Sequence, residues 1–173
     1  KPGDVFYAYN GKSMEILNTD AEGRVVLADA LSYTEKNFKP DLMIDLATLN
    51  GACVVALGSV CAGVMGTGKE LISSLISSGL ATGERLWELP FYKEYHDQVK
   101  SDIADVRNLG LYQREAGAIT GATFLAAFVD KTPWAHLDIA GVSWAEQETP
   151  YLKKGGTGFG VRLLHHFLEQ HGG

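Results

Sequence analysis

The alternation of apolar and polar positions predicts a chain in which helices and short strands take turns. Apolar residues at helical spacing predict helices over residues 24–37, 69–82, 91–100, 117–129 and from 161 onward. Alternating or continuous apolar runs predict strands at residues 5–9, 13–17, 41–49 and 134–139, and residues 51–66 fit a short helix followed by a strand. The pattern favours an α/β fold with a mostly parallel or mixed central sheet, flanking helices and an N-terminal β-hairpin.

Turn signals sharpen this outline. Asn10-Gly11, between the first two strands, predicts a hairpin closed by a type I′ turn. Gly83 is placed to end the helix of residues 69–82 in the left-handed conformation that glycine tolerates. The nearly continuous apolar run 41–49 predicts a central strand that is covered on both faces.

Composition limits the class of protein. The chain has 173 residues, of which 46% are hydrophobic, enough for one globular domain. A net charge of −6, without a cluster of Lys and Arg, argues against a nucleic-acid or anionic-membrane partner. No apolar run reaches the roughly 18 to 20 residues of a membrane helix, and we see no basic-then-apolar leader. Cys53 and Cys61 lack zinc-ligand spacing and suggest a reducing compartment, so we expect a soluble, cytoplasmic protein.

The segment 18–24 concentrates the candidate chemistry. If it is extended up to Gly23, Asp20 and Glu22 project to the same side. Arg24 then lies in the first helical turn, where a cation opposes the helix dipole but together with it favours a bound anion. Two carboxylates beside an anion site suit a divalent metal that acts on a carbonyl substrate. The alternative is ordinary helix capping by these polar side chains.

Two other stretches carry competing interpretations. Residues 63–70 match the spacing of a phosphate-binding P-loop up to the last position, where Glu70 would place a negative charge against the phosphates and disfavours a nucleotide. Asp102 and Asp105 form a rival acidic cluster. Because they are three apart in an extended stretch they would face opposite ways, so we interpret residues 101–108 as loop or edge structure.

The strand ends are further candidates. Residues 48–52 follow a buried strand, which is where an open α/β sheet usually places its ligand. The glycine-rich stretch 140–160 follows another strand and is expected to be a loop of the kind that carries function. Asp45 and His136, inside these two strands, are interpreted as hydrogen-bonded structural groups rather than as a ligand and a catalytic base.

The string Asn18-Thr19-Asp20-Ala21-Glu22-Gly23-Arg24, followed by Val26-Leu27-Ala28-Asp29, resembles the signature of the leucyl aminopeptidases, the cytosol aminopeptidase family. The resemblance continues in residues 45–52, 134–141 and 154–158 and covers essentially the whole chain. It implies that residues 1–173 are the C-terminal portion of the catalytic domain of a two-metal-dependent aminopeptidase. Such an enzyme removes N-terminal residues, preferably leucine-like ones, from peptides, and the family assembles as homohexamers.

The resemblance also implies roles for individual residues. Asp20 would bind one metal ion and Glu22 would bridge two, with manganese or zinc as the candidate ions. Arg24 would be the catalytic residue and, with Gly23 and Leu49, would hold a bicarbonate-like anion that accepts a proton from the attacking water. The substrate-binding positions would be Thr48, Leu49, Gly51, Ala140 and Ser143.

Two departures from the family pattern qualify these roles. Asn50 stands where the family more usually has Thr. The family's remaining metal ligands and its electrophilic lysine lie upstream of the hairpin, in a segment that this sequence does not contain, and two carboxylates are too few for two divalent ions. We therefore expect the isolated chain to bind metal weakly and to be inactive. A non-catalytic oligomeric scaffold or interaction domain that retains the fold, and a nucleotide-binding protein, are the alternatives.

Overall fold

The chain begins with a small three-stranded sheet. The computed structural model describes residues 1–112 and 114–171. In it, β1 (Val5–Tyr7) pairs antiparallel with β2 (Ser13–Glu15), and β6 (Val106–Arg107) adds to β2 in parallel. The predicted hairpin is therefore confirmed, and so is the interpretation of residues 101–108 as edge structure.

The turn of the hairpin differs from the prediction. The backbone N–H of Gly11 bonds to the carbonyl oxygen of Ala8 at 2.8 Å, and Gly11 has φ of +89° while Asn10 lies outside the left-handed region. A type I′ turn needs left-handed backbone at both central residues, so that prediction is wrong. The N–H of Tyr9 instead donates to Oδ1 of Asp29 at 2.8 Å, which holds the wider turn against the first long helix.

The central sheet is mixed, as predicted. Its strand order is β3-β7-β4-β5, with bounds Met43–Ala47, Trp134–Asp138, Ala62–Gly66 and Leu86–Glu88. β3 runs parallel to β7 and β4 parallel to β5, whereas β4 and β7 are antiparallel. β3 stands at the end of this order, so its prediction as a central strand is wrong. Its apolar composition is explained by its faces, since Met43 packs in one core cluster and Ile44 and Leu46 against the other.

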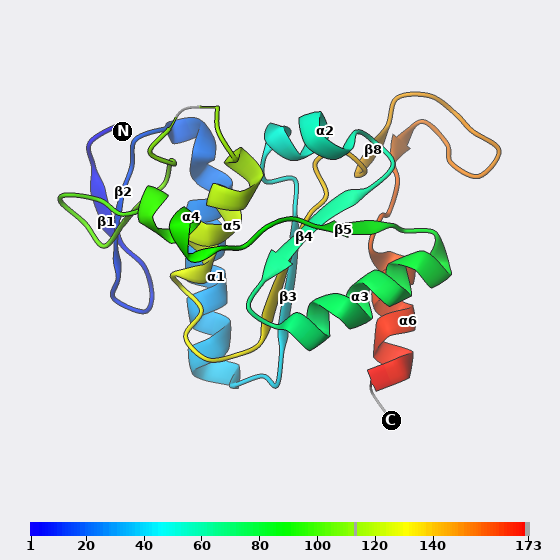
Figure 1. Ribbon diagram of the computed structural model, residues 1–173, viewed down its shortest axis with the longest axis horizontal. Coiled ribbons are helices and arrows are strands. Elements are labelled where there is room, and N and C mark those ends of the chain that lie inside the picture. The colour runs from blue at the N-terminus through cyan, green and yellow to red at the C-terminus, as the bar shows by residue number, and fades with distance from the viewer. Residues whose placement is uncertain (113, 172–173) are drawn as a thin grey trace.

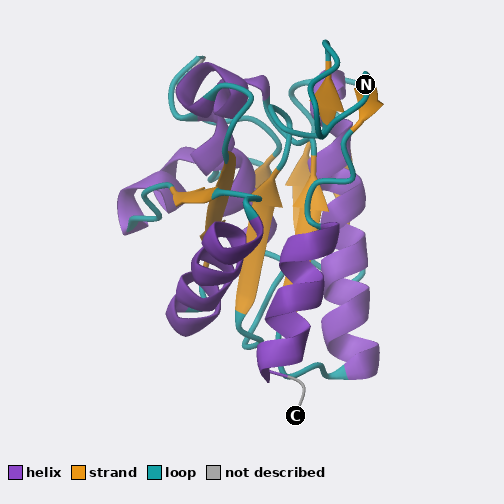
Figure 2. Cartoon of the chain, turned by 90° about the vertical axis from the view of Figure 1, so that its right-hand side faces the viewer, coloured by secondary structure: helices purple, strands orange, loops and turns teal. Residues whose placement is uncertain are grey.

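Helices cover both faces of this sheet (Figures 1 and 2). The bounds are η1 Thr19–Ala21 (a 3₁₀ turn), α1 Glu22–Phe38, α2 Gly51–Leu57, α3 Lys69–Thr82, α4 Lys93–Gln98, α5 Gly117–Ala126 and α6 Val161–His171. α3 has the predicted bounds and ends at Gly83, whose φ is +78°. The predicted loop 140–160 holds one short strand pair, β8 (Trp144–Ala145) with β9 (Gly155–Gly156). Among the described helices, none is long and apolar enough to cross a membrane.

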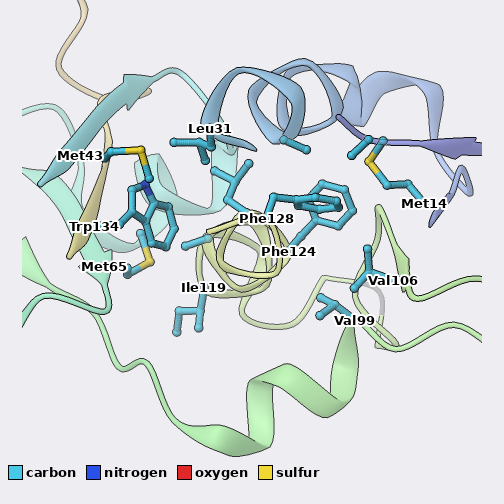
Figure 3. Close-up of a cluster of buried hydrophobic side chains, with 14 residues drawn as sticks. Met14, Leu31, Met43, Met65, Val99, Val106, Ile119, Phe124, Phe128 and Trp134 are labelled. Carbon is cyan, nitrogen blue, oxygen red and sulfur yellow. The ribbon is translucent and has the colours of Figure 1, made fainter. Parts of the chain in front are cut away.

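The core lies in two clusters, one on each face of the sheet. On the α1 and α5 side, Phe124 and Phe128 pack with ring centroids 5.1 Å apart, between Met14 and Trp134 (Figure 3). Truncating a buried aromatic side chain of this kind costs about 3–5 kcal/mol. On the other side, α3 and α6 pack through residues such as Leu75. The two clusters pack against opposite faces of the sheet and hold it in place. They therefore also position the strand ends where the candidate residues lie.

Candidate functional site

The segment 18–24 forms helical turns rather than an extended strand. Asn18 is extended, with φ of −135° and ψ of 122°, and its Oδ1 accepts a hydrogen bond of 2.9 Å from the N–H of Asp20. This cap starts η1 at Thr19, and α1 follows at Glu22, so the chain becomes helical before Gly23. The expectation that Asp20 and Glu22 project together from an extended segment is therefore wrong, because residues two apart in a helix diverge.

Asp20 and Glu22 are both exposed. Carboxylate oxygens of this kind are hard donors that fit a divalent cation. Within residues 1–112 and 114–171, no group of three or more His, Cys, Asp or Glu is placed to hold a metal ion. The two carboxylates suit a metal in their chemistry, but two donors are fewer than a closed metal site has.

Arg24 is buried, with 4% of its surface exposed. Its Nη1 donates to the carbonyl oxygen of Asn108 at 3.2 Å, while Nε is buried and has no partner in the described residues. Burial lowers the pKa of Arg24, and the negative charge of Asp138 acts in the opposite direction. A buried guanidinium with an unused donor is costly unless an acceptor meets it, so Arg24 fits an anion.

Gly121 on α5 leaves room for the guanidinium of Arg24. A Cβ atom at Gly121 would lie 3.1 Å from Nη2 of Arg24 and 3.2 Å from Cδ2 of Leu49. At Gly23, a Cβ would lie 3.9 Å from Cδ1 of Leu49. The three residues of the predicted anion site, Gly23, Arg24 and Leu49, are therefore brought together, with the backbone of α5 beside them.

Asp138 joins the ends of β3 and β7. It is fully buried, and its Oδ1 accepts hydrogen bonds from the N–H of Leu49 at 3.3 Å and of Ala140 at 3.2 Å. Its Oδ2 has no partner among the described residues, and burial raises the pKa of this carboxyl group. Leu49 is one of the residues that the resemblance assigns to the anion site, and its N–H is engaged by Asp138.

The remaining predicted substrate positions lie at the same strand ends. Thr48 directly follows β3 and is exposed, and Gly51 is the exposed first residue of α2. Ser143 is half-buried, donates its N–H to Ile139 at 3.0 Å and accepts one from Thr157 at 3.0 Å. β3 and β7 are adjacent and parallel, so the loops that follow them, residues 48–51 and 140–143, start at the same edge of the sheet. We call these two loops the rim.

Asn50 links this rim to α5. Its Oδ1 caps α2 by accepting the N–H of Ala52 at 2.9 Å, and its Nδ2 donates to the carbonyl oxygen of Gly117 at 3.0 Å. A threonine hydroxyl can cap a helix, but it has a single oxygen on Cβ and lacks the separate Nδ2 donor that reaches Gly117. Asn50, where the family more usually has Thr, therefore connects the start of α2 to the start of α5.

Asp45 and His136 are hydrogen-bonded to each other, as the interpretation of them as structural groups requires. Nδ1 of His136 lies 2.6 Å from Oδ1 of Asp45, and Nε1 of Trp134 donates to Oδ2 of Asp45 at 2.7 Å. These contacts satisfy the carboxylate inside the protein. Asp105, from the rival acidic cluster, is likewise engaged, since its Oδ2 accepts the N–H and the hydroxyl of Ser13.

The P-loop-like stretch lies at the other end of the sheet. Lys69 and Glu70 line a cavity of about 520 Å³ together with Asp41 and Pro133, which precede β3 and β7. Because β4 is antiparallel to β7, its carboxyl end meets the amino ends of those strands. This cavity is therefore separate from the rim at Thr48 and Ala140.

Sequence reasoning missed two residues of the site, Asp138 and Asn108. Asp138 is polar and two residues beyond His136, so the alternation of the strand could have placed it on the same buried face. Asn108 ends an acidic stretch and carries no comparable signal. Both are fully buried. Asp138 accepts the N–H of Leu49, and Asn108 bonds to the backbone of Asn18 and accepts the guanidinium of Arg24.

The chain is similar to known proteins over nearly its whole length. The family model described as "Cytosol aminopeptidase family, catalytic domain" matches residues 1–165. Proteins named "Probable cytosol aminopeptidase" from Geobacter sp. (strain M21) and Geobacter sulfurreducens are each 55% identical to this chain over 98% of its length. The one from Gloeobacter violaceus is 53% identical over 96%. The chain spans about a third of the length of these relatives, 34%, 34% and 32% respectively.

Proposed function

Because the chain belongs to the cytosol aminopeptidase family, we propose that residues 1–173 form the C-terminal portion of a catalytic domain that releases N-terminal residues from peptides. The observation that carries this proposal is the buried Arg24, with an unused Nε donor, one helical turn from two exposed carboxylates. A cation at the start of a helix destabilises the helix. Its burial there supports a bound anion.

The metal-binding role falls to Asp20 and Glu22. We assign Asp20 to one metal ion through its side chain and main chain, and Glu22 to a position between two ions, with manganese or zinc as the candidates. Two divalent ions, when bound, lower the pKa of a water molecule and polarise a peptide carbonyl. Because this chain contributes two carboxylates, it should bind metal weakly and be inactive by itself.

The anion-binding role falls to Arg24 and to backbone groups near Gly23 and Leu49. These would hold a bicarbonate-like anion, which supplies a proton acceptor beside the attacking water when bound. The protein holds the guanidinium rigidly through Asn108 and surrounds it with Leu49 and Gly121, which limits access of bulk water.

The rim at the ends of β3 and β7 would hold the peptide. Thr48, Leu49 and Gly51 offer main-chain groups to the substrate backbone, and Ala140 and Ser143 would shape the pocket for its first side chain, which we take to be leucine-like. The half-buried Ser143 is anchored at both its N–H and its carbonyl, so it can present a fixed wall. By the same family membership we infer a homohexamer that acts in the cytoplasm.

The test compares two proteins, this chain and a longer one that also carries the upstream part of the catalytic domain. We expect the longer protein to release leucine from leucine amide with added Mn²⁺ or Zn²⁺, and the isolated chain to be inactive. Asp20→Asn and Glu22→Gln should each reduce the activity by at least about a hundredfold, whereas Asp102→Asn, at an exposed carboxylate of the rival cluster, should not. Peptide binding and oligomerisation without any dependence on metal would instead support the scaffold alternative.

A further inference from the structure

Asn108 is fully buried beside the candidate site, directly after β6. Its backbone N–H donates to the carbonyl oxygen of Glu15 at 3.0 Å, which extends the pairing of β6 with β2. The acidic stretch that it ends holds no candidate metal cluster among the described residues. The role of Asn108 must therefore be sought in what its remaining groups contact.

The side chain of Asn108 brackets the peptide that leads into the metal-binding segment. Its Oδ1 accepts the N–H of Leu17 at 2.8 Å and of Asn18 at 3.2 Å, and its Nδ2 donates to the carbonyl oxygen of Asn18 at 2.7 Å. A primary amide can accept and donate here at once because its oxygen and its nitrogen are separate atoms. Asn18 in turn caps η1 through the N–H of Asp20 at 2.9 Å.

The backbone of Asn108 holds the other half of the site. Its carbonyl oxygen accepts the 3.2 Å hydrogen bond from Nη1 of Arg24. One buried residue is therefore bonded both to the guanidinium and, through Asn18, to the turn that carries Asp20. Residues from a distant part of the chain, 84 to 91 positions away, are joined at this point.

We propose that Asn108 is a positioning residue that fixes the carboxylate of Asp20 relative to the guanidinium of Arg24. This inference rests on the proposed function, since it concerns the distance between the metal-binding and the anion-binding group. Small errors in such a distance are costly, because a site must be held within about 0.5 Å of its productive geometry. Asn108 touches neither substrate nor metal and acts through Asn18 and Arg24.

The test uses the 173-residue chain and two inorganic probes. Mn²⁺ is followed through the paramagnetic broadening of the backbone amide signals of residues 20–23, and bicarbonate through the shift of the Nε–H signal of Arg24. Asn108→Ala removes the three side-chain hydrogen bonds to Leu17 and Asn18 and should weaken the binding of Mn²⁺ by about tenfold. The binding of bicarbonate should change less, because the backbone carbonyl that accepts the bond from Arg24 remains. Ser32→Ala is the control. Ser32 is buried in α1, the helix that carries Arg24, and its hydroxyl donates to the carbonyl oxygen of Ala28. This variant should lower stability without touching the site.

A second variant disturbs the turn of Asp20 alone and covers the case in which Asn108→Ala does not fold. Asn18→Ala removes the hydrogen bond to the N–H of Asp20 but leaves the bond between Asn108 and Arg24. It should therefore weaken the binding of Mn²⁺ about tenfold and leave the binding of bicarbonate unchanged. The inference would be overturned if a folded Asn108→Ala bound Mn²⁺ as tightly as the native chain does. It would also be overturned if Asn18→Ala weakened the binding of Mn²⁺ and of bicarbonate equally. In both cases the proposed function stands. If the native chain binds neither probe, the same comparison is made in the longer protein that carries the upstream part of the catalytic domain. If that protein also binds neither probe, the proposed site itself is wrong and the inference fails with it.

Discussion

The carboxylate of Glu84 accepts a hydrogen bond of 2.8 Å from the backbone N–H of Leu163, 79 residues further along the chain. The same Oε2 also accepts the N–H of Gly160 at 3.1 Å. Glu84 is 3% exposed and so serves as a buried anionic cap for α6, which brings the glycine-rich loop back to the sheet. Negative charge at this helix end is favourable, and the two N–H groups would otherwise be unsatisfied.

We predict that Glu84→Ala lowers the free energy of unfolding by about 2–3 kcal/mol in urea denaturation. The matched control is Arg162→Ala. Nε of Arg162 lies 3.4 Å from the same carboxylate, but its side chain is 66% exposed. An ion pair at 3.4 Å in which one partner is this exposed contributes at most about 1 kcal/mol. If the arginine variant is destabilised as much as the alanine variant of Glu84, the ion pair rather than the cap holds α6.

The buried pair of Asp45 and His136 gives a second prediction. Asp45→Ala would leave Nδ1 of His136 and Nε1 of Trp134 without the partner that now accepts them at 2.6 and 2.7 Å. We expect a loss of about 3 kcal/mol, because two buried donors lose their acceptor. Asp41→Ala, at an exposed carboxylate just before the same strand, should change stability by less than about 0.5 kcal/mol. Equal effects in thermal unfolding would show that the pair has no special structural role.

Local patterns explain how much of this fold could be predicted. α3 has the predicted bounds because its apolar spacing and its terminal glycine are both encoded within the helix itself. α1 starts two residues earlier than predicted, at Glu22, because the turn η1 leads into it. Asn18 caps η1, and its polar side chain fits an extended segment equally well in the sequence. The place of β3 at the end of the sheet depends on which strand pairs with it, and apolar composition reports covered faces rather than neighbours.

The same distinction applies to the candidate site. Asp20, Glu22 and Arg24 lie in one short segment, so the sequence alone singled them out. Asp138 and Asn108 act through bonds to residues 84 to 91 positions away, and only the fold brings these partners together. No periodicity in the sequence reports a contact of that range.

Glu35 should make stability depend on pH. Burial alone would raise the pKa of Glu35, but hydrogen bonds from the N–H groups of Asp130, Thr132 and Lys131 together lower it below its ordinary value of 4.5. A folded-state pKa below the unfolded one contributes stability above the unfolded pKa, and this is lost as pH falls through the folded pKa.

We therefore predict that Glu35→Gln destabilises the protein at pH 7 and that the difference from the native chain shrinks as pH falls below about 5. Urea unfolding at several pH values measures this difference. The exposed Glu94→Gln serves as the control and should show no such trend. A difference that stays constant down to pH 3 would mean that neutral hydrogen bonding alone, and not the charge, stabilises the loop.

Cys53 should be an unreactive thiol. Burial first, and then the negative charge of Asp138, raise the pKa of Cys53 from 9.0 to about 11. At pH 8 the fraction of reactive thiolate is then about a hundredfold smaller than in the unfolded chain. In a Cys61→Ser background, which leaves one thiol, alkylation by iodoacetamide should be at least about a hundredfold slower in the native state than in urea. Native and unfolded rates within a fewfold of each other would contradict the buried position.

Asn50 allows a test of how the rim is tied to α5. Asn50→Thr keeps an oxygen that can cap α2 but removes the Nδ2 donor that bonds to Gly117 at 3.0 Å. We expect a loss of about 1 kcal/mol, the net value of one hydrogen bond, and faster amide exchange at the start of α5 than at the start of α2. Asn50→Ala, which removes both bonds, should cost about twice as much and expose both helix starts. If the threonine variant is as stable as the native chain, the bond to Gly117 adds nothing, and the family's usual residue would serve this chain equally well.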